Sequence, residues 1–154
     1  MPRENRELLT DIRLQLRDNR LRPIYSVETV FQRIPNRPDR LQDIAMVSGR
    51  DNLAQAIIMR LLTPLGELNA LGHPEYGSRV HELIGSRNTE TTRNLLSLYL
   101  LESLQQEPRI AEVESVRVDL DPVIRERVNV QLQVKPTDDT GSVTIGPFTL
   151  EFEP

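Results

Sequence analysis

The sequence predicts an α+β fold in which a helical N-terminal two-thirds packs on a C-terminal antiparallel β-meander. Apolar residues recur at helical spacing through the middle of the chain, whereas they alternate with polar residues after residue 110. Turn-forming stretches at 121–122 and 136–142 divide the alternating part into three runs. The length of 154 residues is typical of one domain, which we divide into an N-terminal arm, residues 1–40, and a main domain, residues 41–154.

The N-terminal arm has a pattern that fits two kinds of structure. The stretch from Leu8 to Leu16 fits a helix by its apolar spacing, and it fits a strand by the alternation of Ile12, Leu14 and Leu16. Both interpretations stay open. The stretch 22–40 contains three prolines, which predicts an extended segment.

The middle of the chain is predicted to be mainly helical. Residues 41–49 predict a short buried strand, and residues 51–63 then predict a helix with one apolar stripe. The stretch 64–78 is rich in Gly and Pro, which predicts a structured loop, and 78–85 predicts a short helix. Residues 88–106 predict the longest helix, whose apolar residues cover more than one face and indicate a central place in the core or in an assembly.

The last third of the chain predicts three antiparallel strands. The first two strands show simple alternation, around Val118 and Val130. In the third, the apolar residues change from odd to even positions at Gly146-Pro147, which predicts a β-bulge. The alternating apolar residues of this third strand are Val143, Ile145, Phe148, Leu150 and Phe152.

The composition argues against several functional classes. A net charge of −4, with nineteen Lys and Arg scattered among twenty-three Asp and Glu, gives no indication of nucleic-acid binding. The chain has no cysteine, which excludes disulfides and thiolate metal sites and fits a reducing compartment. It has no apolar run of membrane-spanning length, no signal-peptide core, no P-loop and no GxGxxG motif, so we expect neither direct membrane insertion nor a bound cofactor.

Enzymatic activity is also not expected. A glycosidase needs two carboxylates, one of them with a raised pKa. The candidates are Glu67, Glu75, Glu82 and Glu107. Sugar-binding clefts rely on aromatic residues, and this chain has no Trp, three Tyr and three Phe. His73 and His81 lie eight positions apart and outside any known metal-binding motif, so neither a catalytic nor a metal site is predicted.

A charged triplet, Glu107-Pro108-Arg109, lies where the helical pattern stops and the strand pattern begins. Proline is common at such a boundary because it cannot continue a helix. The two charged residues fit either an internal salt bridge at the helix end or a socket for another protein. The last strand likewise fits either a solvated sheet edge or an edge kept open for a partner's strand.

Several residues between positions 41 and 120 form a set by their order and spacing, namely Gly49, Asn52, Leu53, Gln55, Ala56, Arg60, Leu61, Thr63, Gly66, Glu67, Tyr76, Gly77 and Ser78, followed by Glu107, Pro108 and Arg109. With this order and spacing the sequence resembles the baseplate wedge, or sheath-initiator, family of contractile phage tails, which also occurs in bacterial contractile injection particles.

The resemblance implies a structural, non-enzymatic protein that assembles in the cytoplasm and is present as one copy per wedge of a hexagonal baseplate around the tube. Its implied partners are the sheath protein, the wedge proteins and tube or hub proteins. Carried over by position, Glu107, Pro108 and Arg109 bind the wedge. The sheath-facing strand corresponds to Val143, Ile145, Phe148, Leu150 and Phe152. The family also carries lysozyme-related names, so a peptidoglycan-cleaving, tail-associated glycosidase is the alternative.

Overall fold

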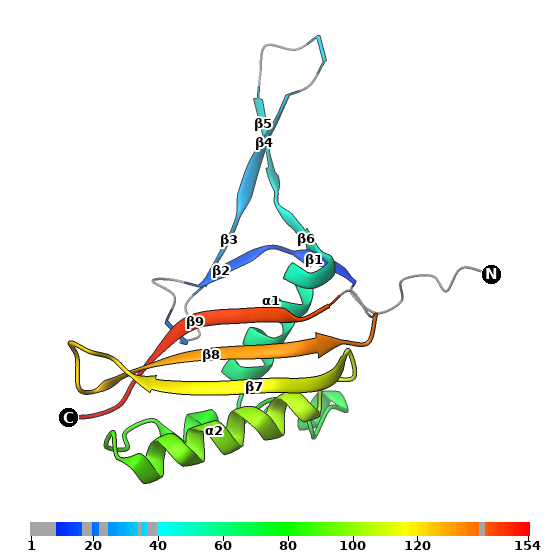
Figure 1. The fold of residues 1–154 in the computed structure, drawn as a ribbon. Helices are drawn as coiled ribbons and strands as arrows, with labels where there is room; N and C mark the ends of the chain where they lie inside the picture. The colour runs from blue at the N-terminus through cyan, green and yellow to red at the C-terminus, as the bar shows by residue number, and fades with distance from the viewer. Residues whose placement is uncertain (1–8, 17–19, 22–24, 34, 37–39, 139–140) are drawn as a thin grey trace.

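The computed structural model describes residues 9–16, 20–21, 25–33, 35–36, 40–138 and 141–154. A three-stranded antiparallel sheet in the order β7-β8-β9 forms the centre of the molecule (Figure 1). Its strands are β7 (Ile110–Leu120), β8 (Arg127–Pro136) and β9 (Val143–Glu151). Two α-helices among the described residues, α1 (Gly49–Leu62) and α2 (Glu90–Gln105), pack on one face of this sheet.

The predicted helical N-terminal two-thirds is wrong. Six short strands precede the first helix in the described residues, and they pair in twos as β1 with β6, β2 with β3 and β4 with β5. Their bounds are β1 (Thr10–Ile12), β2 (Leu14–Leu16), β3 (Tyr25–Val27), β4 (Thr29–Arg33), β5 (Arg40–Ile44) and β6 (Met46–Ser48). Residues 10–16 are therefore extended, because they find hydrogen-bond partners in strands that come later in the chain.

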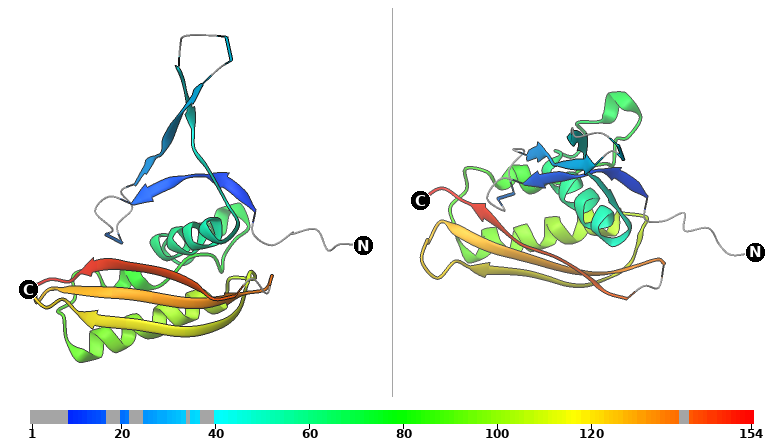
Figure 2. Two further views of the ribbon diagram at one scale, coloured as in Figure 1. Left: turned by 45° about the horizontal axis from the view of Figure 1, so that its top comes forward. Right: turned by 90° about the horizontal axis from the view of Figure 1, so that it is seen from above.

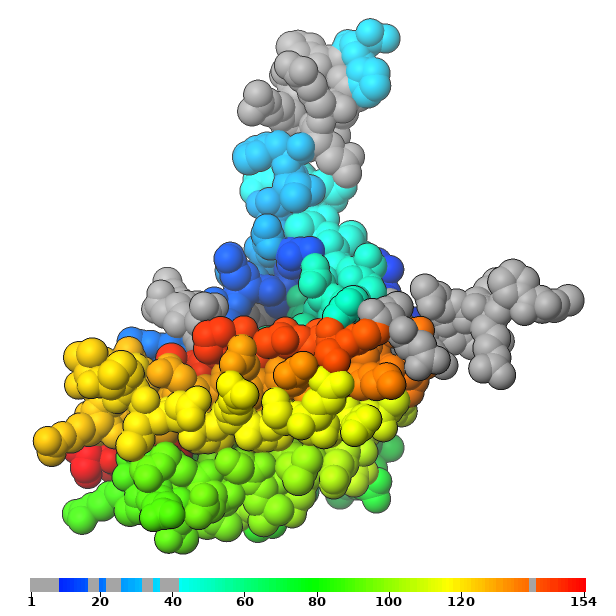
Figure 3. Space-filling model, in the orientation of Figure 1, coloured from blue at the N-terminus to red at the C-terminus, as the bar shows by residue number. Residues whose placement is uncertain are grey.

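The hydrophobic core lies between the sheet and the two helices. Along β8, buried and half-buried residues alternate, so that Val128, Val130, Leu132 and Val134 all point to the helices. On α2, residues four positions apart lie on one face of the helix, so that Leu96, Leu100 and Leu104 all point into the core. The other face of the sheet is uncovered by helices (Figure 3). Burial of one such aliphatic side chain stabilises a fold by about 1.5–3 kcal/mol, so this layer dominates the stability of the domain.

The predicted bulge in the last strand is present. The register between β8 and β9 shifts between Val130 and Leu132, opposite Gly146 and Pro147. Gly146 has a φ of 99°. A Cβ atom at that position would lie 2.7 Å from the Val130 main-chain oxygen, so only glycine fits. The bulge explains why odd-numbered side chains before it and even-numbered side chains after it both face the core.

The N-terminal strands form a second part above the helices. Figure 2 shows α1 lying between these strands and the three-stranded sheet. The β4–β5 hairpin projects away from the body as a narrow ribbon (Figures 1 and 3). Phe31, in the middle of β4, is 67% exposed.

The connection between α1 and α2 is a structured loop, as predicted. It contains two 3-10 helices, η2 (Asn69–Leu71) and η3 (Val80–Leu83), and the second occupies the place of the predicted short helix. No helix in the described part of the chain is both long and apolar enough to cross a membrane.

Candidate functional site

The Glu107-Pro108-Arg109 triplet forms a tight turn between α2 and β7. The Glu107 amide donates to the Leu104 carbonyl at the end of α2, and the Ile110 amide donates back to the Glu107 carbonyl. Pro108 lies exposed at the outside of this turn. The turn carries the chain from the helix layer into the sheet, and it fixes the directions of the two charged side chains.

The Glu107 carboxylate is buried between two arginines. Its residue is 4% exposed. One carboxylate oxygen, Oε2, accepts a hydrogen bond from Arg60 Nη2 at 3.3 Å, and the other, Oε1, accepts from Arg109 Nε at 2.7 Å. Arg60 comes from the last turn of α1 and is itself buried. An internal salt bridge at the end of the helix is one of the two interpretations of the triplet from the sequence, and Glu107 forms such salt bridges with Arg60 and Arg109.

Arg60 links this ion pair to the loop between the helices. Its guanidinium carbon lies 4.5 Å from the centre of the Tyr76 ring, a distance typical of a cation–π contact. Burial raises the pKa of the Tyr76 hydroxyl, and the positive charge of Arg60 partly opposes that rise. Arg60 Nε is buried and has no hydrogen-bond partner in the described part of the protein.

The loop is held against α1 by main-chain contacts that require glycine at residue 77. Gly77 has a φ of 114°, and a Cβ there would lie 2.5 Å from the Thr63 main-chain oxygen. Next to it, Ser78 Oγ donates to the Leu61 carbonyl at 2.7 Å, and the Ser78 amide donates to the Thr63 carbonyl at 2.8 Å. These contacts place Tyr76 over Arg60.

The electrostatics of Glu107 suit a fixed anion and not a proton donor. Burial alone would raise the pKa of the Glu107 carboxyl. The hydrogen bond and charge of Arg109, together with the charge of Arg60, outweigh burial and lower this pKa. A glycosidase acid needs the opposite shift, because it must keep its proton until the leaving group takes it.

None of the other candidate carboxylates is buried as Glu107 is. Glu82 lies exposed on η3 and pairs with Arg79 at 3.1 Å, and the hydrogen bond from Arg79 lowers the pKa of Glu82. Glu67 and Glu75 are exposed on the loop. Among the described residues, no group of three His, Cys, Asp or Glu side chains could hold a metal ion.

A hollow of about 300 Å³ lies beside the buried ion pair. It is lined by Arg60, Gly72, His73, Pro74, Glu75, Tyr76 and Gln106. The sequence motifs contain Arg60 and Tyr76, but spacing along the chain does not indicate that they meet Glu107. The one available signal is an arginine in the apolar stripe of a predicted helix.

The five side chains predicted to face the sheath are buried in the core. Val143, Ile145, Phe148, Leu150 and Phe152 are between 2% and 8% exposed. Any contact of this strand with another protein is therefore restricted to its main chain and its outward side chains. β9 is an edge strand of the sheet, and β7 is the other.

The outer edge of β9 already has contacts from elsewhere in the chain. The Phe152 amide donates to the Glu126 carbonyl, on the β8 side of the strand. Because main-chain groups alternate in direction along a strand, those of Thr149 point away from β8, to the outer edge. The Thr149 carbonyl accepts a hydrogen bond from the Leu21 amide at 2.8 Å. Further on, the Glu153 amide donates to the Ser86 carbonyl at 3.0 Å.

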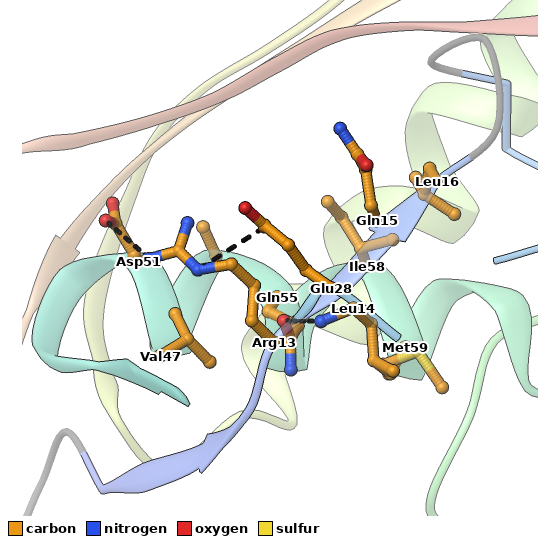
Figure 4. A pocket seen from close by; sticks show the side chains of 11 residues that line it. Arg13, Leu14, Gln15, Leu16, Glu28, Val47, Asp51, Gln55, Ile58 and Met59 are labelled. Atoms are coloured by element: carbon orange, nitrogen blue, oxygen red, sulfur yellow. Dashed lines mark hydrogen bonds and ion pairs between the residues drawn. The ribbon is translucent and has the colours of Figure 1, made fainter. Parts of the chain in front are cut away.

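A second hollow, of about 370 Å³, lies between β2 and α1 (Figure 4). There the Gln55 side chain bridges the N-terminal strands, accepting from the Leu14 amide at 2.8 Å and donating to the Ile12 carbonyl at 2.7 Å. Arg13 lies 3.7 Å from Glu28 and 4.0 Å from Asp51. These polar contacts fasten the N-terminal strands to α1.

A family model described as the contractile injection system sheath initiator matches residues 26–139, which is most of the chain. The fold is similar to the crystal structure of a "putative tail lysozyme" from Geobacter sulfurreducens, with a TM-score of 0.55 and 22% sequence identity. This similarity covers 68% of the present chain and 91% of the other. Among curated proteins, none matches the sequence. At this identity the similar structure shows the fold alone.

Proposed function

Because the chain belongs to the contractile injection system sheath initiator family, we propose that this baseplate component docks to the wedge proteins and templates the first ring of sheath. One copy sits on each wedge of a hexagonal baseplate around the tube, and assembly takes place in the cytoplasm. The work of the protein is binding, not catalysis.

One observation carries the sheath part of this proposal. The sheet uses its apolar side chains for its own core, yet it ends in two edge strands, β7 and β9. A partner's strand that joins such an edge gains main-chain hydrogen bonds. We assign this role to β9, whose core-facing side chains anchor the strand to the helices. These side chains are Val143, Ile145, Phe148, Leu150 and Phe152.

The wedge part of the proposal rests on the turn at Glu107, Pro108 and Arg109. Both charged side chains are fixed in direction by the ion pair, and Arg109 still has 19% of its side chain exposed. Pro108 is exposed between them. A rigid, charged turn favours correct register and partner choice more than raw affinity. We propose that a wedge protein packs on Pro108 and Arg109 while Glu107 holds Arg109 in position.

The sheath contact is tested by removing one outward-facing main-chain amide of β9 while the strand itself is kept. The Asp121 amide bonds to the Arg127 carbonyl on the β7 side, so by alternation the main chains of Leu132 and Val134 face β9. Their partners Ile145 and Val143 bond back to β8, which leaves the Thr144 amide facing outward. Thr144→Pro removes this amide, and an edge strand tolerates proline. Thr144→Ala is the matched control, because it keeps the amide.

Each variant is co-expressed with the sheath protein of the same particle, and sheath rings are counted by negative-stain electron microscopy. We expect rings with the wild type and Thr144→Ala, and a strong loss with Thr144→Pro. Circular dichroism checks that both variants are folded. Equal ring formation by the two variants would show that the sheath does not use this edge.

The competing function is peptidoglycan cleavage. The lowered pKa of Glu107 is unfavourable for it. The test is the turbidity of a cell-wall suspension with the wild type and with Glu107→Gln. We expect no clearing by either protein. Clearing by the wild type that is lost in the variant would replace the structural proposal with an enzymatic one.

A further inference from the structure

We propose that Arg20 and Leu21 occupy, within the same chain, the place beside β9 that a partner's strand takes in the assembled particle. Arg20 and Leu21 thereby indicate which partner segment fits beside β9, namely an extended segment in which a basic residue is followed by an aliphatic one. The inference rests on the proposed function, because it concerns the same edge of the sheet.

The main-chain contact has the form of a strand that has only begun to pair. Arg20 and Thr149 form an isolated parallel bridge, and the Leu21 amide donates to the Thr149 carbonyl at 2.8 Å. No ladder extends from this bridge in the described residues. A single bridge of this kind is exchangeable, because an incoming strand that forms a full ladder makes more hydrogen bonds along the same edge.

The two side chains explain the chemical preference. Leu21 is 5% exposed and belongs to the hydrophobic core, so the place for the second residue is an apolar socket. Arg20 Nη2 lies 3.7 Å from Glu151 Oε1, and the same oxygen accepts from Arg127 Nη2 at 2.6 Å. The Glu151 carboxylate therefore favours a cation at the first residue.

The pair does not fill the space available to it. A hollow of about 280 Å³ remains there, lined by Arg20, Leu21, Ile84, Thr149, Leu150 and Glu151. On its rim, Ile84 is 72% exposed. A longer partner segment can cover Ile84 while it replaces Leu21, and this extra apolar contact favours the partner over the chain's own residues.

Because the two occupants share one space, the chain's own pair must leave before the partner enters. This gives a direct test, since the sequence contains no cysteine. Arg20→Cys combined with Thr149→Cys places two thiols on bridge partners, and neighbouring strands lie about 4.8 Å apart, within the range that a disulfide spans. The matched control is Arg117→Cys with Gln131→Cys, a cross-strand pair of β7 and β8 away from this edge.

Binding of full-length protein to the sheath protein of the same particle is measured with the disulfide oxidised and again after reduction. We expect the oxidised Arg20–Thr149 variant to bind at least about tenfold more weakly than its reduced form, a difference of roughly 1.4 kcal/mol. The control pair should bind equally in both states. Mass spectrometry of the oxidised sample verifies the bond.

Three results would overturn the inference, and they differ in what they say of the proposed function. Failure of the disulfide to form shows that residue 20 does not lie at Thr149. Equal binding by oxidised and reduced forms shows that the partner does not use this place, while sheath binding itself stands. Absence of binding in both forms, and in the control pair, removes the proposed function together with the inference.

Discussion

Substitution of Glu107 by alanine tests whether the buried ion pair is a fixed part of the fold. The change leaves Arg60 buried next to a cavity, with its carboxylate partner removed. Breaking a buried pair in this way costs about 3–5 kcal/mol, whereas domains of this kind are stable by only about 5–15 kcal/mol. With a shift of about 2–4 °C per kcal/mol for chains of this length, we expect the melting temperature to fall by roughly 10 °C.

The stabilising contribution of Glu107 also depends on pH, and its direction follows from the lowered pKa. The pKa of Glu107 is lowered in the folded protein from its usual value of 4.5, so the unfolded chain binds the proton more readily. The stabilising contribution is thus fully present above about pH 4.5 and is lost as the pH falls through the lower, folded pKa. Glu107→Gln cannot titrate, so its disadvantage relative to the wild type should be largest at neutral pH and shrink in acid.

Urea unfolding followed by circular dichroism at pH 7 and at several lower pH values measures both effects. Glu82→Ala is the control, because Glu82 also pairs with an arginine but lies exposed. We expect no measurable loss of stability there. Equal losses for Glu107→Ala and Glu82→Ala, or a gap between Glu107→Gln and wild type that does not change with pH, would refute the reasoning.

Two further predictions concern the core and the bulge. Both Gly146→Ala and Gly141→Ala place alanine at a positive φ, which costs about 1–3 kcal/mol. Gly146→Ala should cost more than Gly141→Ala, because its Cβ also meets the Val130 oxygen whereas nothing lies within 4 Å of the Gly141 Cβ. A similar loss in the two variants, measured by urea midpoints, would contradict the close approach at the bulge. Leu100→Ala, on the buried face of α2, should cost about 2–5 kcal/mol. Leu98→Ala, on the exposed face, should stay within about 0.5 kcal/mol. Reversal of that order would mean that α2 is buried by a face other than the one described.

The parts of the fold that the sequence predicts well are those in which local pattern and burial agree. Both α-helices bury one face against the sheet, α1 with a single apolar stripe and α2 with part of a wider apolar surface. The meander follows strict alternation, and the parity change at Gly146-Pro147 locates the bulge. In each case the residues that decide the structure are neighbours along the chain.

The N-terminal part was not predictable in the same way. Residues 10–16 fit two periods, and the choice between them depends on strand β6 and on the side chain of Gln55, which lie more than thirty positions later. A pattern within ten residues has no information on such partners. The helical expectation failed for this reason.

The candidate site shows the same limit. The Glu107-Pro108-Arg109 turn is visible in the sequence, but Arg60 and Tyr76 join it only through the packing of α1 and the loop. The alternation of Val143 to Phe152 marks the core-facing side of β9. Contact with the sheath stays a prediction, and the burial of these side chains restricts it to the main chain and the outward residues.

The hydrogen bond between Leu21 and Thr149 has a consequence for biosynthesis. The two residues lie more than 120 positions apart. A ribosome adds about 5–20 residues each second, so Leu21 leaves it on the order of ten seconds before Thr149 exists. Closing so long a loop also carries an entropy cost that grows with its length. The contact of Leu21 with Thr149 therefore cannot form until β9 has been synthesised, several seconds after the N-terminal strands become able to pair with one another.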